Sequence, residues 1–246
     1  IIDFWMSNDN KNKYFVNLSN SIETKNLKVG VIGLGYVGLP LALSFCRKGI
    51  EVIGFEINKS IVNLIRNGKS HIKHINSLDI EKYNNSKKLV VNNTFEDIRK
   101  VDAILICVPT PLTTKREPDL SYIINTINEI GKFLKEGQIL SLESTTYPGT
   151  TDEVIKPLIE SYGFKIGKNF FLNYSPERED PGNKLFKSYE IPKVIGGDSK
   201  YCSLIGRKLY EIVNKEVVIV SSTKAAEMTK LLENVYRAVN IALVNE

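Results

Sequence analysis

Short apolar runs alternate with amphipathic segments along most of this chain. Within the runs, apolar and polar residues do not alternate, which is typical of strands buried on both faces. The runs predict strands over 28–32, 51–56, 89–91, 103–108, 139–142, 170–173 and 216–220. The segments between them predict helices over 37–48, 59–67, 121–134, 151–162 and about 200–213. This order predicts an α/β fold, a doubly wound parallel sheet covered by helices on both faces.

Three parts of the chain differ from this pattern. Residues 1–26 are rich in Asn, Lys and Ser without a clean period, so we expect a leader that is partly disordered or lies against the domain. Residues 70–88 are polar and are expected to form a loop region. From Thr223 to Glu246 one helix is predicted, roughly 36 Å long at about 1.5 Å per residue. Its apolar stripe consists of Met228, Leu231, Leu232, Val235, Val239 and Ala242.

This last helix is too long for a crossover on the sheet. We therefore divide the chain into the leader, a sheet domain over 27–222 and the start of a connecting helix over 223–246. A helix that leaves its domain leads to another domain or to a partner subunit, most simply in a homodimer. The sequence begins at Ile1 rather than Met and ends within the helical pattern without a stop signal, so we expect it to be part of a larger protein.

The composition narrows the class of protein. Hydrophobic residues make up 42% and charged residues 25%, which is ordinary for a globular protein. The net charge of +5 is spread without a Lys/Arg block, which disfavours a nucleic-acid partner. No apolar stretch approaches the roughly 20 residues that span a bilayer, so we expect a soluble, cytoplasmic protein without a membrane partner. Cys46, Cys107 and Cys202 lack metal-type spacing and fit reduced thiols, so neither a disulfide nor a metal site is expected.

The segment after the first predicted strand has the spacing of a dinucleotide-binding turn. In KVGVIGLGYVG (28–38), Gly33 allows a sharp turn, Gly35 lets a pyrophosphate approach the backbone, and Gly38 lets the helix pack closely on the sheet. The free N–H groups of the helix N-terminus attract phosphate. Glu56 ends the next strand, where its carboxylate can accept hydrogen bonds from both hydroxyls of an adenosine ribose and would repel a 2′-phosphate. These residues predict a Rossmann-type domain that binds NAD in preference to NADP.

Three further loops follow predicted strands at their carboxyl ends, where ligands bind in such folds. They are 108–112, 143–150 and 173–183, all dense in hydroxyls, prolines and charges. Ordinary rigid turns would explain one such loop, but three beside a cofactor turn favour a ligand site.

The long helix carries two candidate catalytic residues. Lys230 and Asn234 are four residues apart and share a face away from the apolar stripe. A lysine can stabilise a developing alkoxide, and an asparagine can fix the orientation of a substrate oxygen. The alternative is an ordinary solvated face. His71 and His74 lie in the polar region without clustered acids and are expected to be surface histidines.

Five motifs in order resemble the nucleotide-sugar (UDP-sugar) 6-dehydrogenase family, over residues 28–246. They are the glycine turn, VPTP (108–111), STTYPGT (144–150), YSPEREDPGN (174–183) and SSTKAAEMTKLLEN (221–234). The resemblance implies oxidation of a sugar C6 alcohol to a carboxylate with two NAD, in polysaccharide biosynthesis.

The resemblance also implies the roles of single residues. Glu177 aids hydrolysis of a covalent thioester, Lys230 and Asn234 stabilise the C6 oxygen, and Thr145 lies near the nicotinamide and a bound water. The implied cofactor contacts are Gly33, Gly35, Tyr36, Val37, Gly38, Glu56, Pro109, Thr110 and Thr145. The implied substrate contacts are Glu177, Arg178, Lys230 and Asn234.

Two departures from the family pattern affect these expectations. The family's nucleophilic cysteine lies in a glycine-rich motif beyond residue 246, so the chain resembles the cofactor domain and is expected to be inactive alone. Residues 178–183 replace the phenylalanine-leucine stretch of UDP-glucose enzymes. This favours a UDP-N-acetylhexosamine substrate, UDP-N-acetylglucosamine more than the mannosamine epimer or UDP-glucose. The remaining alternatives are a β-hydroxyacid dehydrogenase, which does not account for the Ser-Pro-Glu loop, and a non-catalytic NAD-binding module.

Overall fold

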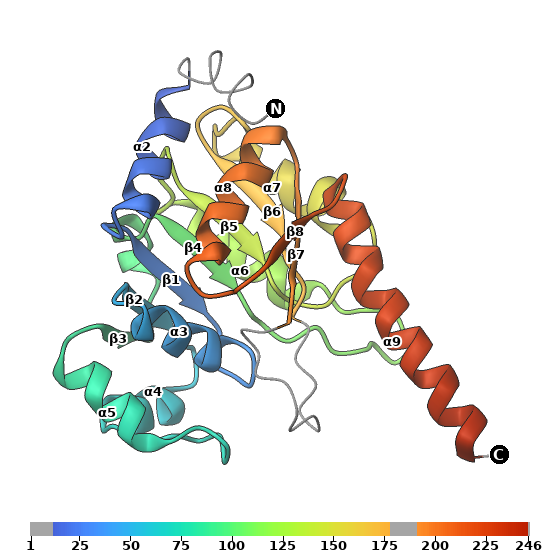
Figure 1. Cartoon of the computed structure of the whole chain (residues 1–246), viewed down its shortest axis with the longest axis horizontal. Helices are drawn as coiled ribbons and strands as arrows, with labels where there is room; N and C mark the ends of the chain where they lie inside the picture. The colour runs from blue at the N-terminus through green and yellow to red at the C-terminus, as the bar shows by residue number, and fades with distance from the viewer. Residues whose placement is uncertain (1–11, 178–190, 246) are drawn as a thin grey trace.

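Eight strands form one sheet in the computed structural model, which describes residues 12–177 and 191–245 (Figure 1). The strands are β1 (Lys28–Ile32), β2 (Glu51–Phe55), β3 (Leu89–Asn92), β4 (Ala103–Ile106), β5 (Ile139–Leu142), β6 (Phe171–Tyr174), β7 (Lys193–Gly197) and β8 (Val217–Ile219). Their order across the sheet is β3-β2-β1-β4-β5-β6-β7-β8. The six strands β1 to β6 are parallel, so the predicted α/β fold with a doubly wound sheet is confirmed.

The sequence analysis expected a parallel sheet, but two of the eight strands run in the opposite direction. β7 pairs antiparallel with β6, and β8 runs parallel to β7, so both strands run against the other six. β7 was missed because its sequence, KVIGG, has only two apolar residues between a lysine and two glycines. All five of its residues are nevertheless buried.

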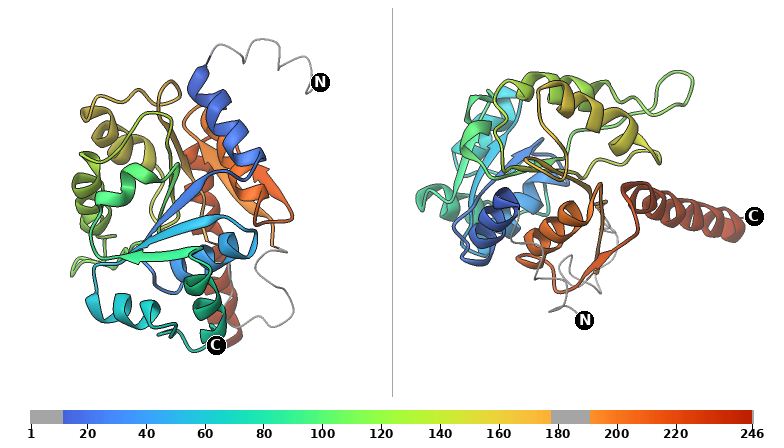
Figure 2. Two further views of the ribbon diagram at one scale, coloured as in Figure 1. Left: turned by 90° about the vertical axis from the view of Figure 1, so that its left-hand side faces the viewer. Right: turned by 90° about the horizontal axis from the view of Figure 1, so that it is seen from above.

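Helices cover both faces of the sheet. They are α2 (Lys13–Glu23), α3 (Gly38–Arg47), α4 (Lys59–Arg66), α5 (Ser77–Asn85), α6 (Ser121–Gly131), α7 (Lys156–Ser161), α8 (Lys200–Glu211) and α9 (Thr223–Asn245), with a 3-10 turn over Glu96–Lys100. Figure 2 shows α2 and α8 on one side of the sheet and α6 and α7 on the other. Each side has its own apolar cluster. Burial on both faces explains why β4, β5 and β6 consist of fully buried residues.

Helix α2 lies in the leader, for which no helix was predicted. The side chain of Asn12 caps it by accepting the N–H groups of Tyr14 and Phe15, both at 3.1 Å. Phe15, Leu18 and Ile22 are buried at helical spacing, and the Phe15 ring lies 4.9 Å from that of Tyr201 on α8. This part of the leader therefore lies against the domain, which was one of the two expected alternatives. The helix itself was not predicted, because its three anchors are separated by Asn and Ser. Residues 1–11 lie outside the described residues.

Two other predicted segments differ in detail. The polar region 70–88 contains α5, which is capped by Asn76 and buries only Ile80 and Tyr83, too few residues to show a period. The predicted helix 151–162 divides into a π-helical segment over Thr150–Ile155 and α7. π-helical segments are common at functional sites.

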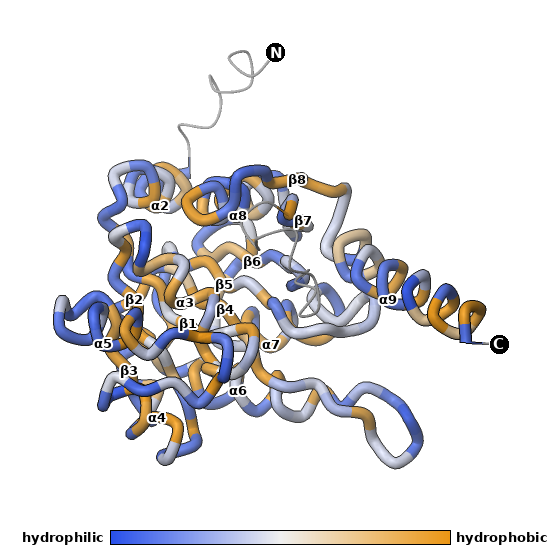
Figure 3. The backbone as a smooth tube through the Cα atoms, turned by 60° about the horizontal axis from the view of Figure 1, so that its bottom comes forward, coloured by the Kyte–Doolittle hydropathy of each residue, from blue (hydrophilic) through white to orange (hydrophobic). Residues whose placement is uncertain are grey.

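Helix α9 leaves the domain and projects away from it (Figures 1 and 2). Its first turn is anchored, since Thr223, Ala226 and Glu227 are buried. Beyond that turn, hydrophobic positions recur to the end of the helix (Figure 3), and Met228, Leu232, Val235 and Val239 are 51–62% exposed. Among the described helices, none combines the length and the apolar character that crossing a membrane requires.

Candidate active site

The glycine turn joins β1 to α3 and leaves its backbone open at one point. Gly33 has a φ of +85°, and its N–H donates to the Phe55 carbonyl at 2.8 Å. A Cβ on Gly38 would lie 1.8 Å from the Gly33 carbonyl oxygen, so only glycine fits there. A Cβ on Gly35 would meet nothing within 4 Å. A phosphate can therefore reach the backbone at Gly35, beside the N-terminus of α3.

The Glu56 carboxylate is held at the end of β2, facing this turn. Its Oε2 accepts the Leu34 N–H at 3.0 Å, and its Oε1 accepts the Asn58 N–H at 2.9 Å. Both oxygens keep further lone pairs for a ribose. Tyr36 is 70% exposed and stacks on His74 at 6.1 Å between ring centroids, and Val37 precedes the first residue of α3.

The loops after β4 and β5 are bonded to each other. The Thr110 hydroxyl donates to the Thr145 carbonyl at 2.7 Å, and the Ser144 hydroxyl donates to the Val108 carbonyl at 2.7 Å. Pro109 and Thr145 are exposed. The sheet order reverses between β1 and β4, and ligands of such folds bind at the carboxyl ends of the strands at this point.

Lys230 of α9 meets the Ser175–Glu177 turn that follows β6. Its Nζ donates to the Glu177 carbonyl, and the Ser175 hydroxyl donates to the Val194 carbonyl at 3.0 Å. Burial lowers the pKa of Lys230, although the negative charge of Glu177 acts in the opposite direction. Lys230 is thus half-buried rather than part of a solvated face, whereas Asn234 is exposed one turn further along α9. Arg178 lies outside the described residues.

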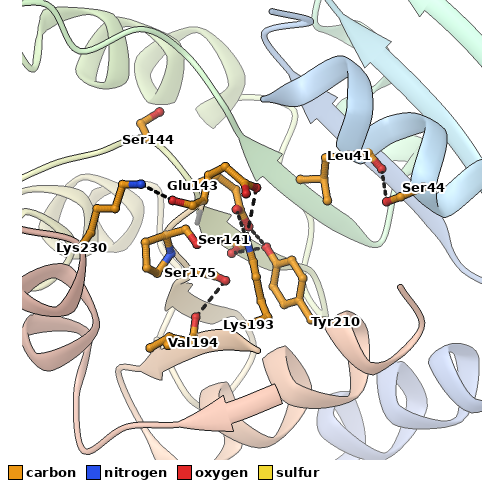
Figure 4. A network of polar contacts seen from close by, with 12 residues as sticks. Leu41, Ser44, Ser141, Glu143, Ser144, Ser175, Lys193, Val194, Tyr210 and Lys230 are labelled. Carbon is orange, nitrogen blue, oxygen red and sulfur yellow. Dashed lines mark hydrogen bonds and ion pairs between the residues drawn. The ribbon is translucent and has the colours of Figure 1, made fainter. Parts of the chain in front are cut away.

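A buried polar cluster beneath this turn was missed by the sequence analysis (Figure 4). The Lys193 Nζ donates to Glu143 Oε2 at 2.6 Å. The Tyr210 hydroxyl donates to Glu143 Oε1 and lies 2.7 Å from the Ser141 hydroxyl. Burial raises the pKa of Glu143, although the Lys193 charge opposes this. Burial also disfavours the Lys193 ammonium, but Glu143 and Glu177 together raise its pKa. Glu143 and Lys193 each lie directly next to a buried apolar run, and this is the sequence signal that could have indicated them.

Glu227 fixes α9 onto the loop after β5. Its Oε2 accepts the Gly149 N–H at 2.6 Å, and its Oε1 accepts the N–H and the hydroxyl of Thr151 at 2.8 and 2.7 Å. The carboxylate is fully buried, and burial raises its pKa. These bonds tie the first turn of α9 to the domain, so they determine where Lys230, one turn later, can reach.

The three cysteines are free thiols, two buried and one half-buried. Burial raises the pKa of all three, of Cys46 to about 12. A thiol activated for nucleophilic attack has a lowered pKa instead. Within residues 12–177 and 191–245, no group of three or more His, Cys, Asp or Glu side chains is arranged to hold a metal ion.

Comparison with known proteins agrees with this geometry. The NAD binding domain of the UDP-glucose/GDP-mannose dehydrogenase family matches residues 27–214. The UDP-N-acetyl-D-glucosamine 6-dehydrogenase of Pseudomonas aeruginosa is 38% identical over 90% of this chain and 52% of that protein. The UDP-N-acetyl-D-mannosamine dehydrogenase of Campylobacter jejuni is 38% identical over 89% of this chain and 55% of that protein.

A solved structure extends the comparison to the fold. The UDP-N-acetyl-mannosamine dehydrogenase Cap5O of Staphylococcus aureus matches with a TM-score of 0.82 and 37% identity, over 89% of this chain and 53% of that chain. The chain thus spans about half the length of the curated relatives it matches. Relatives named for either epimer of the sugar have the same identity to the chain, so identity does not favour the glucosamine epimer that the sequence analysis preferred.

Proposed function

The chain belongs to the UDP-glucose/GDP-mannose dehydrogenase family and carries its NAD-binding domain, and from this premise we propose a specific reaction. The chain supplies the cofactor half of an enzyme that oxidises the C6 alcohol of a UDP-N-acetylhexosamine to a carboxylate. The observation that carries the proposal is the contact of Lys230 with the Glu177 turn, since these residues come from separate motifs and meet beside the cofactor loops. The family match supports this reaction over the β-hydroxyacid dehydrogenase alternative.

The residues around the glycine turn fit a dinucleotide. The open backbone at Gly35 and the N-terminus of α3 would hold the diphosphate, and the Glu56 carboxylate would accept the adenosine ribose hydroxyls. Tyr36 and Val37 would flank the diphosphate, while Pro109, Thr110 and Thr145 would border the nicotinamide. When bound, NAD supplies the acceptor for the two electrons that each oxidation step removes from C6.

Lys230 and Asn234 would act on the sugar C6 oxygen. An ammonium stabilises negative charge as it develops on that oxygen, and an amide one turn along the same helix orients it. Burial already lowers the pKa of Lys230, which brings this group closer to the range in which it can exchange a proton during the reaction.

Glu177 would act in the hydrolytic half of the reaction. Its carboxylate lies at the end of a turn held by Lys230 and by the Ser175 hydroxyl, and such a group can accept a proton from an attacking water. A covalent thioester requires an activated thiol, which Cys46, Cys107 and Cys202 do not provide because burial raises their pKa values. We therefore propose that this chain alone forms no uronic acid.

The setting of the reaction is proposed on similar grounds. Free, buried cysteines are compatible with a reducing cytoplasm. The exposed apolar stripe of α9 is suited to a homodimer contact in the complete protein.

The test is an assay of the full-length protein with NAD. We expect two NADH per sugar and a uronic acid product by mass spectrometry with UDP-N-acetylglucosamine or UDP-N-acetylmannosamine, tested side by side. UDP-glucose is the control that lacks the acetamido group. NAD binding without turnover of any of the three sugars would reject the proposal and leave a non-catalytic NAD-binding module.

A further inference from the structure

One ammonium group is buried directly beneath the Ser175–Glu177 turn. Lys193, the first residue of β7, is 5% exposed. Besides its bond to Glu143, its Nζ donates to the Pro176 carbonyl at 3.2 Å and lies 3.8 Å from Glu177 Oε2. Figure 4 shows it between the carboxyl end of β5 and Tyr210 of α8. The end of β5, the turn after β6 and α8 thus converge on one charge.

Stability alone does not account for a charge at this position. Taking an ion pair out of water costs more than its attraction returns in many proteins, and an apolar pair of the same volume is often as stable or more so. If the Lys193–Glu143 pair served only to fill the core, Lys193 would need no contact other than the one with Glu143. Lys193 instead contacts the turn twice, through the Pro176 carbonyl and the Glu177 carboxylate.

The other members of the cluster orient this ammonium. The Tyr210 hydroxyl donates to Glu143, which fixes the carboxylate on which Lys193 rests, and the Tyr210 ring lies 5.1 Å from the Lys193 Nζ. On its far side the turn is held by Lys230, which bonds to the Glu177 carbonyl. Glu177 is therefore held through its carbonyl from one side and through its carboxylate from the other.

We propose that Lys193, oriented by Glu143 and Tyr210, is a positioning residue that determines where the Glu177 carboxylate points during the reaction. The proposal rests on the role of Glu177 in the proposed function. Lys193 is not a catalytic residue, because it is enclosed by the cluster and reaches the reaction only through the turn. Lys230, by contrast, is open to solvent on part of its surface.

The experiment uses the full-length protein and a paired variant. Lys193→Met alone would leave the Glu143 carboxylate buried without its counter-ion, so the informative variant combines Lys193→Met with Glu143→Gln. This variant removes both charges and keeps an acceptor for the Tyr210 hydroxyl. The matched control is Lys156→Met with Asp198→Asn, which removes another lysine–carboxylate pair, 2.9 Å apart, that does not touch the turn.

We expect the paired variant to bind NAD with wild-type affinity while kcat falls by about 10²-fold, the usual effect of a misplaced catalytic group. Like Glu177→Gln, it should accumulate a covalent intermediate that mass spectrometry detects. Lys193→Arg, which keeps the positive charge, should retain most of the wild-type kcat. Hydrogen exchange should rise in the Ser175–Glu177 turn and stay unchanged in the glycine turn. The control variant should change none of these values.

The outcomes separate the two proposals. An unchanged kcat and unchanged exchange in the turn would overturn the positioning role and leave a structural ion pair. A loss of NAD affinity in the paired variant would also overturn it, because the pair would then support the whole sheet. If the wild-type protein oxidises no UDP-sugar, the proposed function fails, and exchange in the turn alone decides whether Lys193 positions Glu177.

Discussion

Replacing Glu56 by glutamine is the smallest change that tests how this domain selects its cofactor. The two Glu56 oxygens accept N–H groups from Leu34 of the glycine turn and from Asn58. Glutamine keeps the length and one oxygen, so it can keep one of these bonds but presents an NH₂ group where the second acceptor stood. The negative charge that would face a 2′-phosphate is lost.

The size of the effect follows from the kind of hydrogen bond. Bonds to a charged acceptor contribute about 1.5–3 kcal/mol and neutral ones about 0.5–1.5 kcal/mol, so two ribose hydroxyls lose about 1 kcal/mol each. NAD binding should therefore weaken by about 2 kcal/mol, roughly 30-fold. NADP can lose only the bond of its 3′-hydroxyl, because a phosphate replaces the 2′-hydroxyl. It is also relieved of repulsion, which for two unit charges 4 Å apart near a protein surface is about 4 kcal/mol. NADP affinity should stay the same or increase, and the preference for NAD should narrow.

Titration calorimetry of this 246-residue chain with both cofactors measures the two affinities. Glu51→Gln is the matched control, because Glu51 begins the same strand. Within the described part of the chain it pairs with two lysines at the surface, Lys28 at 3.1 Å and Lys88 at 3.9 Å. This variant should leave both affinities unchanged. An equal loss of NAD and NADP affinity in Glu56→Gln would refute the reasoning, since the carboxylate would then support the glycine turn through Leu34 without selecting the ribose.

Four further predictions address the rest of the molecule. In the full-length enzyme, Lys230→Ala should lower kcat by about 10² to 10³ with NAD affinity unchanged, and an unaltered chemical step in single-turnover kinetics would withdraw the catalytic role. Glu227→Ala removes the acceptor of two buried N–H groups, so urea unfolding should show a loss of about 2–6 kcal/mol; a loss below about 1 kcal/mol would contradict the anchoring of α9. Burial raises the pKa of Cys46 to about 12, so about one thiol in 10⁴ is ionised at pH 8. Iodoacetamide should therefore label Cys46 far more slowly in the native chain than in urea. Equal labelling rates would argue against its burial. Light scattering of this chain should detect dimers at high micromolar concentration that Val235→Asp with Val239→Asp abolishes, and a wild-type chain that stays monomeric would exclude α9 as an association surface.

Local features of the sequence were sufficient for seven of the eight strands and for the helices α3, α4, α6, α7 and α8. A strand buried on both faces is an uninterrupted apolar run, and the glycine turn needs specific residues within eleven positions, so both are visible without knowledge of the rest of the chain. Elements with few buried residues were not visible in this way. α5 buries only Ile80 and Tyr83, and the anchors of α2 are diluted by polar neighbours.

The contacts within the candidate site were decided by the tertiary structure. Lys193 and Glu143 are 50 residues apart, and Lys230 and Glu177 are 53 residues apart, so no local pattern links either pair. They meet because β5 and β6 are adjacent parallel strands whose carboxyl ends lie at one edge, while β7 runs the opposite way and begins at that same edge. The reversed direction of β7 places Lys193, its first residue, at the turn. The buried Glu227 carboxylate fixes the start of α9 and thereby places Lys230 at the same turn.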